Sequence, residues 1–163
     1  PVPRDLALKM GAKGAFGRND EAALKMALGD GADVVVSTVN GWADWQAALR
    51  LAGRNGVIAC LGFPGRGQQA PEANPLDSQY FYMKQLRIEA VGWSPEIDDS
   101  RGFPRFNERA NIVWLAGLIE RGRLDPGLII SGRYPGADIA RAYDDLIARV
   151  GSPITYLLDW SAA

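Results

Sequence analysis

Residues 31–67 contain two short apolar runs on either side of a helix-forming stretch, and this pattern constrains the fold more than any other feature. The runs 33–38 and 57–62 are rich in Val and Ile, which is typical of strands covered by helices on both faces. Between them, apolar side chains recur at helical spacing at Trp45, Ala48, Leu49 and Ala52. The connection is long enough for a right-handed crossover between parallel strands. The sequence therefore predicts a βαβ unit, and with it an α/β fold with a mostly parallel sheet.

Small and turn-forming residues follow both predicted strands. They are Ser37, Thr38, Asn40 and Gly41 after the first, and Gly62, Pro64, Gly65 and Gly67 after the second. Open α/β sheets bind ligands at the carboxyl ends of their strands. Glycine there lets a ligand approach the backbone. We therefore expect any binding site at this edge of the sheet.

The residue counts exclude several kinds of chemistry. The chain has no histidine and one cysteine, so it cannot contain a Ser-His-Asp or Cys-His triad, and we expect no metal site. Cys60 lies inside an apolar run and is expected to pack as a small hydrophobe. Asp98, Asp99, Asp144 and Asp145 fall in segments that read as solvated, so we predict no catalytic residue.

Charge and hydropathy bear on partners and location. The net charge is -1 and no Lys/Arg cluster stands out, which argues against nucleic acid and against a membrane surface as partners. No apolar run approaches the roughly 18 residues of a membrane helix. The first residues lack the apolar core of a secretory signal, so we expect a cytoplasmic protein with one core.

Periodicity and breakers predict the other elements of the chain. They are a helix ending at Gly11, a short strand at 13–17, a helix capped by Asn19 or Asp20 and ended by 29–31, a short helix at 76–84, a strand at 86–93, a helix at 107–121, an extended segment at 129–130, a helix from Asp138 and a strand at 154–160. Tyr80, Phe81 and Tyr82 allow two interpretations, a stacking platform for rings or packing within the fold.

The whole pattern resembles the medium-chain dehydrogenase/reductases, the alcohol dehydrogenase-like enzymes, from about Leu6 to Trp160. The segments that carry the resemblance are ALKMGAKGAF, GADVVVSTVNG, ALRLAGRNGVIACLGFPG, LRIEAVGW, LIERGRLDPGLIISGRYPGADIARAYDDLIA and ITYLLDW. The tail looks especially like the branch with sorbitol- and threonine-dehydrogenase-like members. The resemblance implies a Rossmann-like sheet with helices on both faces. It also implies that residues 1–163 are part of a dinucleotide-binding domain.

Two parts of that family's pattern are absent from the sequence. There is no G-x-G-x-x-G turn to hold a pyrophosphate, since Gly62, Gly65 and Gly67 have the wrong spacing, and there is no catalytic domain. We therefore expect a domain truncated at its N-terminal side, from a parent that uses NAD or NADP. We expect no cofactor to bind this chain alone.

The family resemblance also implies contacts and a partner. The residues that would line the adenine and nicotinamide-ribose side are Thr38, Val39, Gly62, Phe63, Val91, Gly92 and Trp93. Ordinary packing explains them equally well in the intact parent, and is the favoured explanation for this chain alone. Strand 86–93 would pair across a two-fold axis in a homodimer. Segment 13–17 would lose its neighbouring strands, so either it is displaced or another chain fills the gap.

Two functions remain open at this point. The first is the cofactor-domain portion of an NAD(P)-dependent alcohol or polyol dehydrogenase-like oxidoreductase. The second is a truncated, non-catalytic Rossmann-like module that acts in dimerisation or binding. A third, an unrelated small α/β enzyme, would need a polar constellation that the sequence does not provide.

Overall fold

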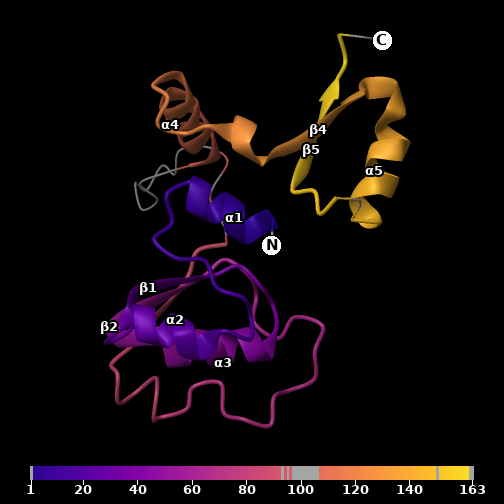
Figure 1. Cartoon of the computed structure of the whole chain (residues 1–163). Coiled ribbons are helices and arrows are strands. Elements are labelled where there is room, and N and C mark those ends of the chain that lie inside the picture. The colour runs from indigo at the N-terminus through magenta and orange to yellow at the C-terminus, as the bar shows by residue number, and fades with distance from the viewer. Residues whose placement is uncertain (1, 93, 95, 97–106, 150, 162–163) are drawn as a thin grey trace. The chain divides into compact units, whose positions relative to one another are not determined.

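The structure is a computed structural model that describes residues 2–92, 94, 96, 107–149 and 151–161 (Figure 1). The chain forms two compact units. One comprises Phe16–Arg109, and the other combines Pro1–Ala15 with Ala110–Ala163. No helix among the described residues is long and apolar enough to cross a membrane.

The Phe16–Arg109 unit is built on a three-stranded parallel sheet of β1 (Ala32–Ser37), β2 (Ala52–Cys60) and β3 (Arg87–Ala90), in that order. The predicted βαβ unit is confirmed, because β1 and β2 are parallel and α3 (Trp42–Leu51) joins them. β2 begins earlier than predicted, at Ala52. The register shifts between Ala32 and Val34, so the strand absorbs extra residues there.

Helix α3 forms the core of this unit together with the sheet. The predicted apolar stripe is buried as expected, and the buried cluster consists of Trp45, Ala48, Leu49, Ala52, Ile58 and Leu86. Ile58 has no exposed surface and pairs with Val35 and Ile88 across the sheet. A large apolar side chain buried this fully contributes about 2 kcal/mol, so the α3–β2 contact anchors the unit.

A second helix, α2 (Glu21–Leu28), contacts α3. Arg50 on α3 donates from Nε and Nη2 to the two carboxylate oxygens of Glu21, at 2.8 and 2.7 Å. Lys25 lies 2.9 Å from the same carboxylate. These cations lower the pKa of Glu21 to about 2, with Arg50 as the main cause. A two-pronged ion pair therefore ties the two helices.

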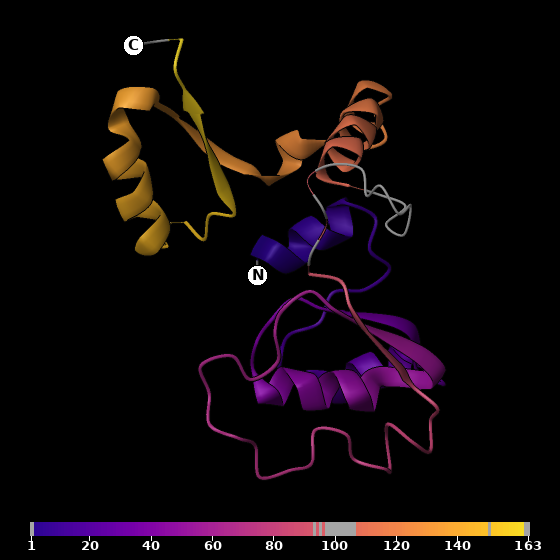
Figure 2. The ribbon, with the colours of Figure 1, turned by 180° about the vertical axis from the view of Figure 1, so that it is seen from behind.

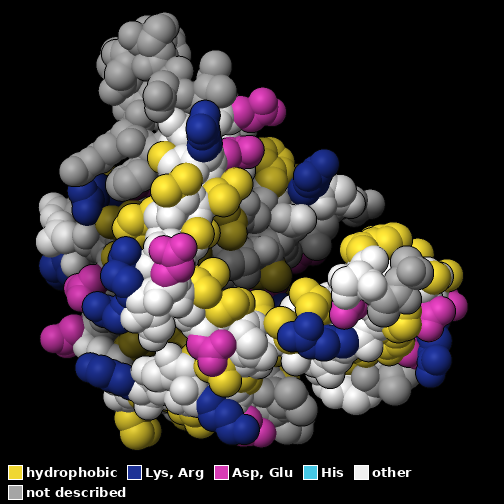
Figure 3. Space-filling model, turned by 90° about the horizontal axis from the view of Figure 1, so that it is seen from above, with side chains coloured by type: hydrophobic (Ala, Val, Ile, Leu, Met, Phe, Trp, Pro, Cys, Tyr) yellow, Lys and Arg dark blue, Asp and Glu magenta, His cyan; other side chains and the backbone are white. Residues whose placement is uncertain are grey.

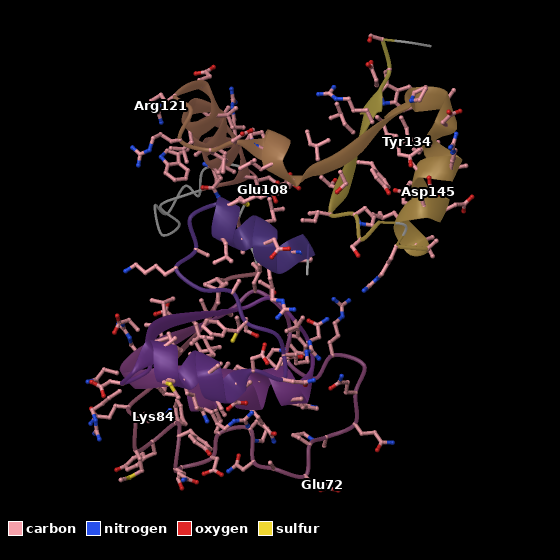
Figure 4. All side chains as sticks on the ribbon, in the orientation of Figure 1. Glu72, Lys84, Glu108, Arg121, Tyr134 and Asp145 are labelled. Atoms are coloured by element: carbon pink, nitrogen blue, oxygen red, sulfur yellow. The ribbon has the colours of Figure 1, made fainter. Side chains whose placement is uncertain are left out.

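The other unit contains α1 (Val2–Lys9), α4 (Glu108–Glu120), two short 3-10 turns (Pro126–Ile129 and Gly136–Asp138), β4 (Ile130–Pro135), α5 (Ile139–Ile147) and β5 (Thr155–Asp159). β4 and β5 are parallel and α5 connects them, which makes a second βαβ unit. Tyr134 of β4 donates a hydrogen bond to Asp145 of α5 at 2.6 Å (Figure 4). Its ring meets that of Tyr156 edge-on at 5.0 Å. The sequence predicted the helices, a last strand and an extended segment at 129–130, but not the full length of β4 or its pairing with β5.

Two predicted elements are wrong. Residues 13–17 form no strand, because a strand needs a hydrogen-bonded neighbour and the described sheet places none beside them. Residues 76–84 form a series of turns rather than a helix, with the Asp77 side chain accepting from Gln79 N at 2.8 Å. Tyr80 and Phe81 pack against the core, which favours the packing interpretation, while Tyr82 is exposed.

Apolar surface remains uncovered in both units. Val34 and Val36 on β1 are 59% and 60% exposed, although their pattern is that of a covered strand. No residue of α4 is buried. Charged side chains of both signs are interspersed over the face in Figure 3, in line with the net charge of -1.

Candidate ligand-binding groove

A groove of about 590 Å³ lies where β2 and β3 end, at the carboxyl edge of the parallel sheet. The residues that line it are Asn40, Trp45, Cys60, Leu61, Gly62, Phe63, Pro64, Arg66, Ile88, Ala90 and Gly92. They come from the end of β2 and the turn after it, from β3, from α3 and from the turn after β1. The groove therefore occupies the edge of the sheet that the sequence predicted.

Close backbone contact shapes the groove. Leu61 N and Gly62 N donate to Ser37 O at 2.9 and 3.0 Å, and Val91 N donates to Cys60 O at 3.0 Å. A Cβ on Gly62 would lie 2.8 Å from Val39 O, and one on Gly92 would lie 2.9 Å from Leu61 O. Both distances are too short for a side chain, so glycine is required where the strand ends come together.

The segment that follows β2 passes α3 and is tied to it (Figure 2). Trp42 Nε1 donates to Gln69 O at 2.9 Å, and Trp45 Nε1 donates to Pro75 O at 2.7 Å. These indole bonds join residues 27 and 30 positions apart in the chain. The wall formed by Phe63, Pro64 and Arg66 therefore belongs to an anchored segment.

At its far end this segment is held by Lys84 (Figure 4). Its ammonium donates to Leu49 O, Arg50 O and Ala52 O at 3.0, 3.0 and 2.7 Å. These carbonyls belong to the C-terminal end of α3, where helices leave acceptors without intrahelical donors. Lys84 thus caps the C-terminal end of α3, whereas the groove lies at the N-terminal end of the helix.

The groove has few groups that could carry out chemistry. Burial raises the pKa of the Cys60 thiol, which keeps it protonated at neutral pH and makes it a poor nucleophile. Among the described lining residues, Arg66 alone is charged and none is acidic. The arrangement is suited to holding a ligand, because it offers an apolar floor with a few polar groups at its rim.

The structure brings some of the predicted site residues together. Gly62, Phe63 and Gly92 line the groove, whereas Thr38, Val39 and Val91 are exposed and are not among its lining residues. Trp93 lies outside the described residues. Whether any of them contacts a cofactor stays a prediction. Sequence reasoning missed Asn40, Trp45, Cys60 and Arg66 as site residues. Of these, Asn40 and Arg66 stand in the Gly-rich turns that mark the site.

A smaller cavity of about 210 Å³ lies in the second βαβ unit. Ile139, Ala142, Tyr143 and Leu146 of α5 face Thr155, Tyr156 and Leu158 of β5 across it. Its lining is almost wholly apolar, and it carries no charged group that could orient a ligand. We therefore take the groove at the sheet edge as the functional site.

Together, the parallel βαβ architecture and the groove at the carboxyl edge of the sheet define a Rossmann-like α/β protein with a ligand site in the position typical of that class. The predicted fold class is thus confirmed. A family model described as "Zinc-binding dehydrogenase" matches residues 2–104. The chain belongs to this family. No curated protein matches the chain.

Solved structures agree with the fold. An alcohol dehydrogenase zinc-binding domain protein from Burkholderia ambifaria has a TM-score of 0.72 and 21% identity, covering 97% of this chain and 39% of that one. Alcohol dehydrogenase TADH from Thermus sp. ATN1 has a TM-score of 0.69 and 22% identity, covering 97% and 42%. An alcohol dehydrogenase from E. coli CFT073, complexed with NADH, has a TM-score of 0.67 and 15% identity, covering 96% and 41%. The chain spans only about 40% of the length of such proteins.

The zinc in the family's name can be tested against these residues. In the part of the chain that the structure describes, no three His, Cys, Asp or Glu side chains gather as metal ligands. The chain has no histidine, and its single cysteine lies in the groove among apolar neighbours. The residues do not fit a zinc ion, so no step proposed below passes through one.

Proposed function

We propose that this chain is the cofactor-domain portion of an NAD(P)-dependent alcohol or polyol dehydrogenase-like oxidoreductase. The observation that carries the proposal is the groove at the carboxyl edge of a parallel sheet in a chain of the dehydrogenase family. Its volume of about 590 Å³ is within the range of small-ligand sites. A nicotinamide cofactor, when bound, would supply the hydride acceptor or donor.

The groove residues have a positional role in this proposal. Trp45, Cys60 and Ile88 form an apolar floor that excludes water from one face of a ring. The backbone at Gly62 and Gly92 sets the shape of the groove, because neither position tolerates a side chain. The chain lacks the G-x-G-x-x-G turn that holds a pyrophosphate, so we expect its affinity for the complete cofactor to be weak.

An NMR titration of the 163-residue chain tests this function. NAD(H) and NADP(H), at concentrations up to the millimolar range, should shift the amide signals of Gly62, Phe63 and Gly92. Adenosine lacks the nicotinamide ring, its ribose and the phosphates, and should leave these amides unchanged. If NAD(H) and adenosine shift the same amides, or if neither shifts them, the nicotinamide assignment fails.

We further propose that β3 is the dimer edge of this protein. In the part of the chain that the structure describes, β3 pairs with β2 alone, and the sequence of the strand is Arg87-Ile88-Glu89-Ala90. In an antiparallel pair of two copies centred on Ile88, Arg87 of each copy stands opposite Glu89 of the other. Opposite charges placed across strands stabilise a pair by about 0.2–1 kcal/mol each. The strand is therefore complementary to itself.

A charge-reversal series, followed by analytical ultracentrifugation, tests whether two copies of the chain associate through β3. The unmodified chain should dimerise, and Arg87→Glu should weaken the dimer because it sets two carboxylates opposite each other. The double variant Arg87→Glu with Glu89→Arg should restore the dimer, since the pair is merely inverted. If the double variant is as weak as the single one, β3 does not form the interface.

The alternative function, a non-catalytic module, rests on the same unpaired edge. It predicts the dimer without any nicotinamide binding. A chain that dimerises through β3 but shows no groove shifts with millimolar NAD(H) would favour the module over the oxidoreductase portion.

A further inference from the structure

Arg66 is an available cation at the rim of the groove. It lies in the turn that follows β2, and its side chain is exposed. Among the described residues, Arg18 pairs with Asp44 and Arg50 pairs with Glu21, but Arg66 has no ion pair or side-chain hydrogen bond. Its guanidinium therefore has all its donors available to a ligand.

The backbone that carries Arg66 is held in place. Gly65 N donates to Asn40 O at 2.6 Å, and Arg66 N donates to Phe63 O at 3.3 Å. Beyond Arg66, the Gln68 side chain accepts from Trp42 N at 3.2 Å. Gly65 lies so close to the Trp42 ring that a Cβ there would overlap it. Because these contacts fix the turn, less conformational entropy is lost when a ligand binds Arg66.

The electrostatics of the groove favour an anion. Of the described residues that line it, Arg66 carries the single charge, and no carboxylate offsets it. In the same turn, the backbone N–H groups of Phe63 and Gly67 have no acceptor within the described part of the chain. A guanidinium and neighbouring N–H groups together suit an anion with several oxygens, such as phosphate.

We propose that Arg66 binds the phosphate group of a phosphate ester whose ring or sugar lies on the groove floor of Trp45, Cys60 and Ile88. This inference rests on the proposed function, since it concerns the same groove and names a chemical feature of its ligand. The phosphate has two possible sources. One is the nicotinamide mononucleotide half of the cofactor, and the other is a phosphorylated polyol substrate.

Protection of Cys60 against alkylation provides the assay. Cys60 is the only cysteine of the chain and lines the groove, so its alkylation rate reports occupancy of the groove. The ligands form pairs that differ by one phosphate: nicotinamide mononucleotide with nicotinamide riboside, and sorbitol 6-phosphate with sorbitol. In the full 163-residue chain, the phosphate-bearing member of at least one pair should protect Cys60 with roughly tenfold higher affinity than its phosphate-free partner.

Variants of Arg66 assign that advantage to its side chain. Arg66→Met should abolish the difference within the pair, and Arg66→Lys should retain part of it, because an ammonium keeps the charge but not the planar fork. Arg123→Met removes an exposed arginine that is not among the residues lining the groove and should retain the full difference. Unfolding curves of the variants confirm that each remains folded.

The outcomes separate this inference from the proposed function. If mononucleotide and riboside protect equally, with or without Arg66, the nicotinamide function stands and the role of Arg66 is refuted. If an Arg66-dependent advantage appears only for sorbitol 6-phosphate, Arg66 binds a substrate phosphate and the nicotinamide assignment loses support. If no phosphate ester protects Cys60 at millimolar concentration, the inference is overturned, while the NMR titration still decides the cofactor.

Discussion

Replacing Lys84 by Met should destabilise the Phe16–Arg109 unit by about 2 kcal/mol. In the structure the Lys84 ammonium donates hydrogen bonds to three backbone carbonyls, those of Leu49, Arg50 and Ala52, at 2.7–3.0 Å. Methionine keeps most of the aliphatic stem but donates no hydrogen bond, so the change isolates the polar contacts. The ammonium also lies 5.4 Å from the centre of the Tyr80 ring, a cation–π contact that the change removes as well.

The magnitude follows from opposing contributions. A hydrogen bond to a charged group contributes about 1.5–3 kcal/mol, and a cation at a helix C-terminus contributes about 0.3–1 kcal/mol. Burial, followed by the nearby Lys25, lowers the pKa of Lys84, which shows that desolvation of the ammonium offsets part of this gain. Water can reach a half-buried site and replace some of the lost bonds. A net loss of about 2 kcal/mol is the balance.

Urea denaturation followed by tryptophan fluorescence measures this loss, because Trp42 and Trp45 lie on α3, the helix whose C-terminal end Lys84 caps. Lys13→Met is the matched control, since Lys13 is exposed and its loss should change stability by less than about 0.5 kcal/mol. The two variants have the same charge, so their difference reports the carbonyl contacts. Should Lys84→Met unfold at the same urea concentration as Lys13→Met, the capping role of Lys84 is wrong.

Three further changes test other contacts. Gly62→Ala should cost about 1–3 kcal/mol in urea denaturation and distort the groove, because its Cβ would press on the Val39 backbone. Gly132→Ala is the control and should cost less, because its backbone is not left-handed and its Cβ would meet the Tyr156 ring at an ordinary contact distance of 3.4 Å. Arg50 and then Lys25 lower the pKa of Glu21 from 4.5 to about 2. The ionised Glu21 carboxylate therefore stabilises the fold above pH 4.5, and this contribution is lost as the pH falls towards 2. Glu21→Gln should remove about 1 kcal/mol of the acid dependence of the unfolding free energy. The hydrogen bond to Asp145 raises the pKa of Tyr134 to about 12. The protonated Tyr134 hydroxyl therefore stabilises the fold below pH 10, and this contribution is lost as the pH rises towards 12. Tyr134→Phe should remove this loss of stability at alkaline pH, as measured by unfolding curves.

The parts of the fold that the sequence predicted are those that local pattern determines. The apolar runs at β1 and β2 and the 3.6-residue stripe of α3 fix element type, and the carboxyl-edge rule then places the groove. Residues 13–17 and 76–84 were predicted wrongly because neighbours decide their conformation. Residues 13–17 have no strand to pair with in the described sheet. Residues 76–84 form turns that bring Lys84 into contact with the end of α3. Arg66 was missed as a site residue because the Trp42 contacts that hold its turn join distant parts of the chain.

The composition of the groove bears on what this chain contributes to a reaction. Transfer of a hydride from an alcohol also requires a group that accepts the hydroxyl proton. The described groove residues offer only an arginine, which stays protonated, and a thiol whose pKa burial raises. In the proposed function the described groove residues therefore hold a ligand, and none of them accepts that proton. It follows that Cys60→Ser should leave the pH dependence of nicotinamide riboside binding unchanged, since that ligand carries no phosphate. If Cys60→Ser moved this pH dependence, the Cys60 thiol would take part in proton transfer.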